Sequence, residues 1–381
     1  MLKNVKALQK ITKEVAMKIP KESKDFTVDW LNEALFNWGK LGSNEVTGCK
    51  AIDSDIPGQT AEIVLLDVSY KNTLSELPHK MVAKIASRNP MVLEQIIANY
   101  DQYRRETSFY SEFPDVGIAT PECLYAEHNP ETQDCVILMR DLAPAESPSW
   151  AITASQAIEA INSLPAFHAK WWNDPILKQK DWMVQNDNYD FYTAALGGAN
   201  ASAPVLKSLF EKTDTTTEIM QVLNSKIPAV INYISAQPLT FVHGDYHAKQ
   251  MFFPTTNGGD FAVIDWQFPF VAQGAWDFAR MIGMCMATPD RQANEADLLR
   301  KYHQQLLSHG VQDYTMDQLE NDYRMGLIVS QMIMCIASAS TDIAIFEKEC
   351  GDLGVDWRDA LFFRTQHALE EWDALAFAKS I

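Results

Sequence analysis

The chain has 381 residues, 47% of them hydrophobic, and a formal net charge of −18. A chain of this length can bury a large core and usually divides into two or more domains or lobes. The acidic excess argues against nucleic acid as a partner, because binding a phosphate backbone requires clustered Lys and Arg. It leaves room for a cationic small substrate, although an acidic surface that provides solubility is the more common explanation.

Cysteine usage and apolar segments indicate where the protein resides. The six cysteines are scattered without a Cys-x-x-Cys pair, which indicates a reducing compartment. The first residues are basic but lack the continuous apolar segment of a signal peptide. The most apolar later segment, 326–339, contains Ser330 and Gln331 and is too short to span a bilayer. We therefore expect a soluble, cytoplasmic protein without a membrane partner.

Residues 1–140 have the pattern of a small α+β lobe. A short leading helix precedes a second helix that opens at Thr27 and runs through Phe36. Asn89 and Pro90 supply an N-cap and a first helical proline for a long helix with an apolar stripe. Runs of apolar and β-branched residues predict the strands of the lobe, at 49–52, 61–70, 80–86 and 135–139.

Residues 141–381 are predicted to be mainly helical. Thr153 and Gln156 have the spacing of a capping box at the start of one helix, which Pro165 is expected to bend. Further helical patterns cover 222–235, 277–287, 295–309, 316–339 and 357–377. The sequence therefore predicts a two-lobed α+β fold, with domains at 1–140 and 141–381 and a ligand in the cleft between them.

The segment 241–266 is the most informative part of the chain. An apolar strand end leads into a polar loop with two histidines and an aspartate, and two apolar runs follow on either side of a Pro-, Asn- and Gly-rich turn. These runs predict a β-hairpin. Antiparallel pairing would place Gln250 beside Asp265, with Asp245 a few residues away. Two carboxylates and an amide oxygen, one to accept a proton and two to hold a hard cation, suit phosphoryl transfer from a metal nucleotide.

These residues carry a resemblance to a known family. The runs His243-Gly244-Asp245-Tyr246-His247, Ile264-Asp265-Trp266 and Gly274-Ala275-Trp276-Asp277-Phe278-Ala279, with Gln250, resemble the catalytic segment of the choline kinase and aminoglycoside phosphotransferase superfamily, which has a protein-kinase-like fold. The run 164–172 is similar to the ecdysteroid-kinase-like branch. The resemblance spans roughly 25–345 and implies transfer of the γ-phosphate of ATP, with Mg²⁺, to a hydroxyl of a small molecule. Family members phosphorylate amino alcohols, aminoglycosides, steroids and sugars, so the acceptor stays open.

Asp245 is the expected catalytic residue. It would orient the acceptor hydroxyl and take its proton; the alternative is an aspartate that caps its own turn. Asp265 and Gln250 would hold Mg²⁺. The family pattern has Asn at the position of Gln250, and the extra methylene leaves metal number and turnover open.

The expected nucleotide contacts come mainly from the first lobe. Lys84, on an apolar strand, would hold the phosphates and pair with Glu106 on the following helix, with Lys80 as a rival. The turn at Gly58 could cover the phosphates, but a lone glycine is equally compatible with an ordinary hairpin. Met139 and Arg140 would form the connector that reads the adenine edge; the alternative is a simple loop.

Four further positions complete the predicted site. The resemblance implies that His243 supports the catalytic loop, and we expect Asp277 to accept backbone hydrogen bonds beneath it. Trp266 and Trp276 could bind a cationic acceptor, although aromatic residues in such runs more often belong to the core.

Two other classes of function stay open. Gln250 and the sparse glycine loop are compatible with a catalytically impaired nucleotide-binding module. His243, Asp245 and His247 could instead bind zinc in a hydrolase. A protein kinase is disfavoured because the His-Arg-Asp and Asp-Phe-Gly signatures are absent. The use of ATP or GTP and the oligomeric state are not decided by the sequence.

Overall fold

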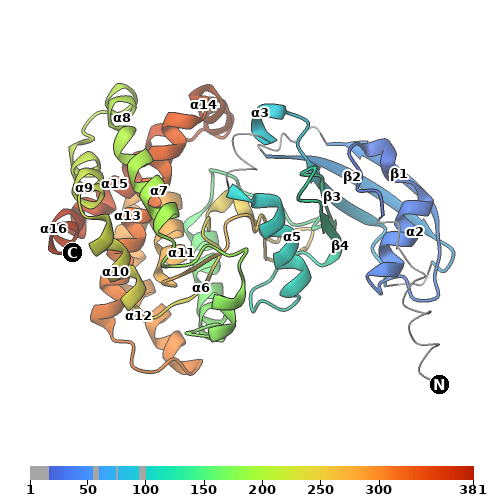
Figure 1. Cartoon of the computed structure of the whole chain (residues 1–381), viewed down its shortest axis with the longest axis horizontal. Coiled ribbons are helices and arrows are strands. Elements are labelled where there is room, and N and C mark those ends of the chain that lie inside the picture. Colours follow the sequence, from blue (N-terminus) through green and yellow to red (C-terminus); the bar gives the residue numbers. More distant parts are fainter. Residues whose placement is uncertain (1–16, 55–59, 74–75, 94–99) are drawn as a thin grey trace, which may run out of the picture. The chain divides into compact units, whose positions relative to one another are not determined.

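The structure, a computed structural model, describes residues 17–54, 60–73, 76–93 and 100–381. The chain divides into two compact units (Figure 1). Unit 1 comprises Met1–Thr107 and Glu122–Asp141, and unit 2 comprises Ser108–Pro121 and Leu142–Ile381. The boundary after Asp141 falls one residue beyond the domain boundary expected from the sequence. The segment Ser108–Pro121, expected in the first domain, belongs to unit 2.

Among the described residues of unit 1, five antiparallel strands form one sheet in the order β1-β2-β3-β5-β4. The strands are β1 (Val46–Asp53), β2 (Ala61–Tyr70), β3 (Lys80–Ala86), β4 (Cys123–His128) and β5 (Cys135–Arg140). The helical elements are η1 (Ser23–Asp25), α2 (Val28–Asn37), α3 (Pro90–Val92) and α5 (Gln102–Glu112), the last of which crosses into unit 2.

One face of this sheet is buried by α2. Along β2, Val64, Leu66 and Val68 are buried while the residues between them are exposed, which is the alternation expected of a strand with one face in the core. The α2 side chains Leu31 and Leu35 belong to the same core cluster. The residues between the buried ones therefore point to the opposite face, and Lys84 of β3 belongs to that face because it pairs with Ile63.

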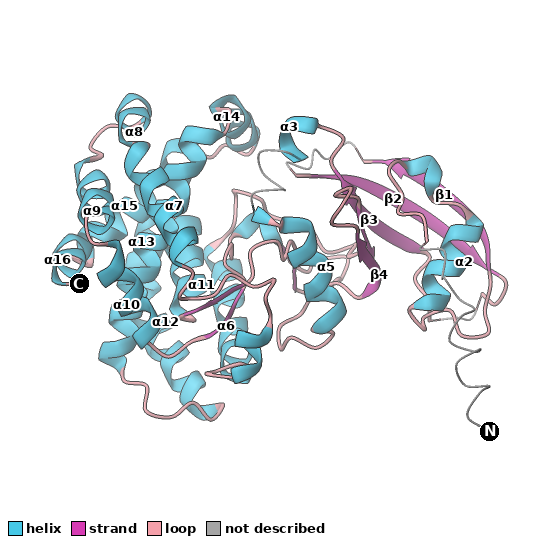
Figure 2. Ribbon diagram, viewed as in Figure 1, coloured by secondary structure: helices cyan, strands magenta, loops and turns pink. Residues whose placement is uncertain are grey.

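Unit 2 is mainly helical (Figure 2). Its first helical elements are α6 (Ala154–Lys170), η3 (Pro175–Gln179), α7 (Tyr189–Ala201), α8 (Ala203–Leu209), α9 (Asp214–Asn224) and α10 (Ile227–Ala236). After the segment 241–266 follow α11 (Ala275–Arg280), η5 (Met281–Cys285), α12 (Thr288–Ser308), α13 (Met316–Ser340), α14 (Ile343–Asp352), η6 (Asp359–Phe363), α15 (Arg364–Glu371) and α16 (Ala374–Ser380).

Proline explains where one predicted helix divides. The sequence analysis placed a single helix over 222–235, but α9 ends at Asn224 and α10 starts at Ile227 with Pro228 in its first turn. Proline lacks the amide hydrogen that a helix interior needs, so it starts a new helix here. The capping box at Thr153 and Gln156 is confirmed at the start of α6, and Pro165 lies within that helix.

The predicted hairpin is present in unit 2. The strands β7 (Met251–Phe252) and β8 (Ala262–Val263) pair antiparallel, and the Ile264 amide donates to the Gln250 carbonyl at 2.8 Å. Gln250 therefore lies opposite Ile264, and Asp265 follows one residue later than expected. A short helix, η4 (Ala248–Gln250), precedes the hairpin. The sequence analysis did not predict the antiparallel pairing of β6 (Thr240–Val242) with β9 (Phe270–Ala272).

Within the described ranges, no single helix has the length and apolar character needed to cross a membrane. The pair α13 and α14, bent by 112° at their junction, passes that test by length and composition only.

Candidate active site

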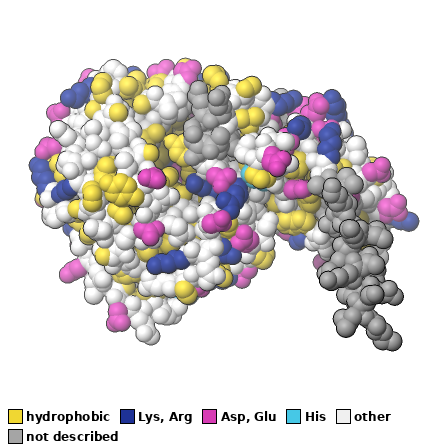
Figure 3. Space-filling model, in the orientation of Figure 1, with side chains coloured by type: hydrophobic (Ala, Val, Ile, Leu, Met, Phe, Trp, Pro, Cys, Tyr) yellow, Lys and Arg dark blue, Asp and Glu magenta, His cyan; other side chains and the backbone are white. Residues whose placement is uncertain are grey.

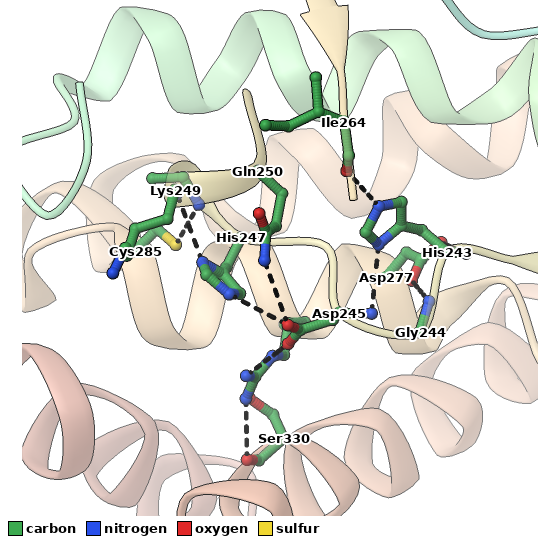
Figure 4. A network of polar contacts seen from close by, with 12 residues as sticks. His243, Gly244, Asp245, His247, Lys249, Gln250, Ile264, Asp277, Cys285 and Ser330 are labelled. Atoms are coloured by element: carbon green, nitrogen blue, oxygen red, sulfur yellow. Dashed lines mark hydrogen bonds and ion pairs between the residues drawn. The ribbon is translucent and has the colours of Figure 1, made fainter. Parts of the chain in front are cut away.

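Asp277 fixes the backbone of the loop that carries Asp245. From the first turn of α11, its carboxylate accepts hydrogen bonds from the amides of His243 at 2.7 Å and Gly244 at 2.9 Å (Figure 4). Gly244 has φ 81°, and a Cβ there would lie 2.0 Å from the Phe268 carbonyl oxygen. The turn therefore requires glycine, and the role that the sequence analysis gave to Asp277 matches its contacts.

A buried histidine, His168, contacts the Asp277 carboxylate. His168 of α6 has Nδ1 2.7 Å from the Tyr302 hydroxyl and Nε2 3.4 Å from Asp277 Oδ2. It has no exposed surface. His168 is therefore a core histidine with both ring nitrogens in contact with polar groups.

The hydrogen bonds of His243 define its tautomer. Nδ1 accepts from the Asp245 amide at 3.3 Å, so Nε2 carries the hydrogen and donates to the Ile264 carbonyl at 2.9 Å. His243 thereby ties the catalytic loop to the end of β8. With both nitrogens bonded to backbone, it is not arranged as a zinc ligand, and no metal-binding cluster of three His, Cys, Asp or Glu occurs within the described parts of the chain. These observations disfavour the zinc alternative.

The Asp245 carboxylate is held on both oxygens. Oδ1 accepts from Arg280 Nη2 at 2.7 Å and Nε at 3.2 Å, while Oδ2 lies 3.2 Å from His247 Nε2 and 3.5 Å from Gln250 Nε2 (Figure 4). Burial raises the pKa of Asp245, but the charges of His247 and Arg280 outweigh it and hold the pKa well below its ordinary range. Asp245 is therefore an anion throughout the neutral range.

Gln250 and Asp265 supply oxygen donors at the end of the hairpin that lies away from its turn. The amide nitrogen of Gln250 points to Asp245, so its Oε1 is the end directed away. Asp265 is half-buried at the end of the hairpin and has a left-handed backbone with φ 64°. A carboxylate and an amide oxygen are hard donors of the kind that Mg²⁺ prefers, so the donor set is compatible with the predicted metal site.

The structure brings Lys84 and Glu106 together. Lys84 Nζ lies 2.7 Å from Glu106 Oε2, and the side chains are 12% and 1% exposed. A lysine and a glutamate at such low exposure require each other, because an unpaired buried charge is costly. Lys80, the rival, is exposed.

A row of apolar side chains lies on the same face of the sheet as Lys84. Strand register places Ile52 opposite Leu65, Leu65 opposite Val82, and Val82 opposite Met139. Ile52 and Leu65 remain 46% and 43% exposed. Apolar surface of this kind, beside a buried lysine, suits a flat apolar ring attached to an anionic group.

The connector residues show a different arrangement from the one expected. The Arg140 amide donates to the Glu122 carbonyl at 2.9 Å, and its guanidinium pairs with the Glu122 carboxylate at 2.8 Å. The Arg140 amide is therefore not open to an adenine edge, which argues against the expected use of that group. Met139 lies in β5 within the apolar row. Gly58 is outside the described residues.

Both candidate substrate tryptophans are buried. Trp266 has no exposed surface, stacks on Phe109 at 4.0 Å and donates from Nε1 to the Val263 carbonyl. Trp276 is 5% exposed within α11. An aromatic cage needs exposed ring faces, so in this structure neither indole is placed to receive a cation. The core alternative fits both residues better.

Sequence reasoning missed several residues around Asp245. Arg280 ends α11, three residues after Asp277, and an arginine within a run of mostly apolar residues was the available signal. Trp150 lies parallel to the His247 ring at 5.8 Å and donates to Glu349 of α14. Lys249 also contacts Glu349, at 2.7 Å. These long-range contacts have no local sequence signature.

Solved structures with a similar fold include several small-molecule kinases. Choline kinase from Cryptosporidium parvum Iowa II matches with a TM-score of 0.52 and 12% identity, covering 93% of this chain and 96% of that chain. Plasmodium vivax ethanolamine kinase matches with a TM-score of 0.47, 10% identity and coverage of 87% and 82%. A thermostable mutant of aminoglycoside phosphotransferase APH(4)-Ia, in a ternary complex with ADP and hygromycin B, matches with a TM-score of 0.46 and 11% identity. The match covers 91% of this chain and 99% of that chain.

The structural neighbours are thus choline, ethanolamine and aminoglycoside kinases, and the similarity to the choline kinase shows that this chain has a protein-kinase-like α+β fold. The DUF1679 family, whose model is described as "Uncharacterized oxidoreductase dhs-27", matches residues 183–351, less than half of the chain. No two glycines of the sequence are separated by one residue, so the dinucleotide-binding fingerprint of many oxidoreductases is absent. The comparison with curated proteins gives no significant match.

Proposed function

We propose that the protein is an ATP-dependent phosphotransferase that acts on a hydroxyl of a small molecule. The observation that carries the proposal is the buried Lys84–Glu106 pair, with its 2.7 Å contact beside an exposed apolar row. A structural ion pair alone would not need that row of exposed apolar side chains next to it. When bound, Mg²⁺·ATP supplies the γ-phosphoryl group and the cation that offsets its developing negative charge.

The proposal gives each residue one task. Lys84, oriented by Glu106, would hold the α- and β-phosphates, and the apolar row would contact the base. Asp265 and the amide oxygen of Gln250 would hold the metal. Asp245 would accept a hydrogen bond from the acceptor hydroxyl and take its proton, while the surrounding loop stays fixed by Asp277.

Partners and location follow as further proposals. The acceptor is a hydroxylated small molecule, and the proposal includes neither nucleic acid nor membrane among the partners. The cytoplasm is the proposed location, where ATP and reduced cysteines coexist. Because Trp266 and Trp276 are buried, the structure offers no support for a tryptophan cage around a cationic acceptor.

Thermal stability with nucleotide is the first experiment. ATP and ADP, each with and without Mg²⁺, are added to the wild type, Lys84→Met and Asp265→Ala. Ligand at about 100 times its Kd should stabilise by roughly 2.7 kcal/mol, a shift of several degrees. We expect a Mg²⁺-dependent shift in the wild type that Asp265→Ala removes. The absence of any shift with either nucleotide would contradict the proposal.

Transfer is then measured as ADP release in the presence of choline, ethanolamine, hygromycin B and uncharged polyols.

A second candidate, a nucleotide-binding module without turnover, is favoured by one observation: both oxygens of Asp245 already have partners, including the amide of Gln250. Nucleotide-dependent stabilisation without ADP release on any acceptor, and with Mg²⁺-independent affinity, would favour that candidate. Gln250→Asn, which matches the family pattern, tests whether the longer side chain limits turnover.

A further inference from the structure

The Arg280 guanidinium is a buried cation whose position is fixed from two sides. Its Nη2 and Nε donate to Asp245 Oδ1, and its Nη1 donates to the Ser330 carbonyl at 3.2 Å. Ser330 lies on α13, so a second helix as well as α11 determines where the guanidinium sits (Figure 4). Within the described residues, Asp245 is the carboxylate that Arg280 contacts.

The close approach of the two helices depends on a glycine. A Cβ at Gly326 would lie 2.8 Å from the Ala275 carbonyl oxygen and 2.8 Å from Ala279 Cβ. Ser330 follows Gly326 by four residues and therefore shares its face of α13. Gly326 thus lets the helices approach closely enough for Ser330 to reach Arg280.

The contacts of Asp245 distinguish its two oxygens. Both Arg280 donors meet Oδ1, at 2.7 and 3.2 Å, whereas Oδ2 has no contact shorter than 3.2 Å among the described residues, with 3.2 Å to His247 and 3.5 Å to Gln250. A hydroxyl bound to a carboxylate lies at about 2.5–2.7 Å. An incoming hydroxyl would therefore displace the contacts at Oδ2, at 3.2 and 3.5 Å, more easily than the two guanidinium contacts at Oδ1, one of which is 2.7 Å long.

We infer that Arg280 is a positioning residue that holds Asp245 by Oδ1, so that Oδ2 is the oxygen that receives the acceptor hydroxyl. This inference rests on the proposed function. Asp245 Oδ2 takes the hydroxyl proton while the hydroxyl oxygen bonds to the γ-phosphorus, and the bond from that phosphorus to its bridging oxygen breaks as ADP leaves with the electron pair. A carboxylate free to rotate would offer the hydroxyl a poorly defined acceptor, and misplacement of about 1 Å costs on the order of 10²-fold in rate.

The test separates positioning from folding. Arg280→Met and Arg280→Lys are compared for kcat and KM with Mg²⁺·ATP and the best acceptor of the screen. We expect Arg280→Met to lower kcat on the order of 10²-fold with little change in KM, and Arg280→Lys to restore part of the loss. Arg291→Lys is the matched control, because Arg291 is equally buried but pairs with Glu295 and Glu371. It should lower stability without lowering kcat.

A double-mutant cycle asks whether Arg280 acts through Asp245. In the Asp245→Asn background, Arg280→Met should cause no further loss of rate, and urea unfolding of the same four proteins should show a coupling between the two positions. Should Arg280→Met not fold, Arg280→Lys in both backgrounds answers the same question.

The outcomes distinguish the inference from the proposal beneath it. Equal kcat in Arg280→Met and the wild type, a change confined to KM, or independent losses in the two backgrounds would overturn the role of Arg280 alone. No phosphoryl transfer by the wild type would overturn both, whatever the variants show.

Discussion

At the residue scale, the surroundings of Asp245 define what kind of base it can be. Its pKa is held well below the ordinary range, after burial, by the charges of His247 and Arg280. Such a carboxylate is always ionised but a weak proton acceptor. This suits a phosphoryl transfer with a loose transition state, in which orienting the hydroxyl matters more than removing its proton early. The main task of Asp245 would then be orientation.

The Lys84–Glu106 pair gives a direct test of stability. Glu106→Gln leaves the largely buried Lys84 without its anion, and we expect unfolding to become easier by roughly 2–4 kcal/mol. Lys84→Met removes the cation that lies 2.7 Å from the buried Glu106 carboxylate and should have a similar effect. Urea unfolding of both variants measures these changes.

The control is the double variant Lys84→Met/Glu106→Gln, which has no unpaired charge. It should recover a large part of the lost stability, since replacement of both partners is often nearly neutral. A double variant whose loss equals the sum of the single losses would show that the two groups do not depend on each other.

Asp322 predicts an unusual dependence of stability on pH. It is buried in α13, and burial, opposed in part by the Tyr314 hydrogen bond, raises its pKa to about 7. The folded state then binds a proton more tightly than the unfolded chain. Its contribution is full below the ordinary pKa of about 4 and is lost as pH rises through about 7. The melting temperature should therefore decrease as the pH rises from about 4 to about 7.

Asp322→Asn checks this assignment, because asparagine does not titrate. Subtracting its pH profile from that of the wild type should isolate a loss of roughly 2–4 kcal/mol that accumulates between about pH 4 and about pH 7 and levels off above it. Two profiles that run parallel from acid to neutral pH would show that Asp322 is not the group responsible.

Sequence reasoning succeeded for residues whose partner could be located by periodicity. Lys84 and Glu106 were paired because strand and helix patterns fixed which face each side chain occupies. Arg280 was missed because its contact with Asp245 depends on how α11 packs on α13, which a single sequence does not specify. Trp266 shows the same limit, since only the folded chain reveals Phe109 stacked on its ring.

At the element scale, the crossing of α11 and α13 is the critical packing feature. Gly326→Ala would normally favour a helix by about 1 kcal/mol. Here the new Cβ meets backbone and Cβ atoms at 2.8 Å, so we expect a net loss of about 1–3 kcal/mol, measured by urea unfolding. Activity should fall as well, because α11 carries Asp277 and Arg280.

Gly197 provides the matched control for this substitution. It lies inside α7, and a Cβ there would have no neighbour within 4 Å. Gly197→Ala should stabilise the protein by about 0.5–1 kcal/mol. If both alanine variants changed stability in the same direction, the packing explanation for Gly326 would fail.

Elements were predictable where local chemistry determines them. The hairpin, the α6 capping box and the strands β1, β2, β3 and β5 follow from turn residues, caps and alternation, whereas β4 was not predicted. The β6–β9 pairing was not, because both strands have three residues and their partners are distant in sequence. The division of 222–235 at Pro228 could have been predicted from the proline alone.

At the scale of the whole molecule, net charge gives the next prediction. The chain carries −18, and on the face drawn in Figure 3 acidic side chains are dispersed among basic ones. The excess negative charges repel one another in the folded state, and salt screens this repulsion. Raising NaCl from about 20 to about 200 mM at neutral pH should therefore raise the melting temperature. Near the isoelectric point of about 4.8 the same addition should have much less effect. A salt effect equal at both pH values would contradict this explanation.

The fold class was predictable as a whole because the catalytic segment is distinctive and most of the chain follows the expected order of elements. The contacts beside His247 were not predictable, since they come from segments far apart in the sequence whose packing only the folded chain defines. Trp150, Lys249 and Glu349 illustrate this: they meet beside His247 although up to 199 residues separate them.

The left-handed backbone at Asp265 has an evolutionary consequence. A residue with φ 64° and a Cβ is strained, and glycine would relieve that strain. Selection for stability alone would favour glycine at this position. An aspartate retained here among related sequences would therefore indicate selection for its carboxylate. If Asp265 holds the metal as proposed, selection for the proposed activity would remove Asp265→Gly, although that variant relieves backbone strain.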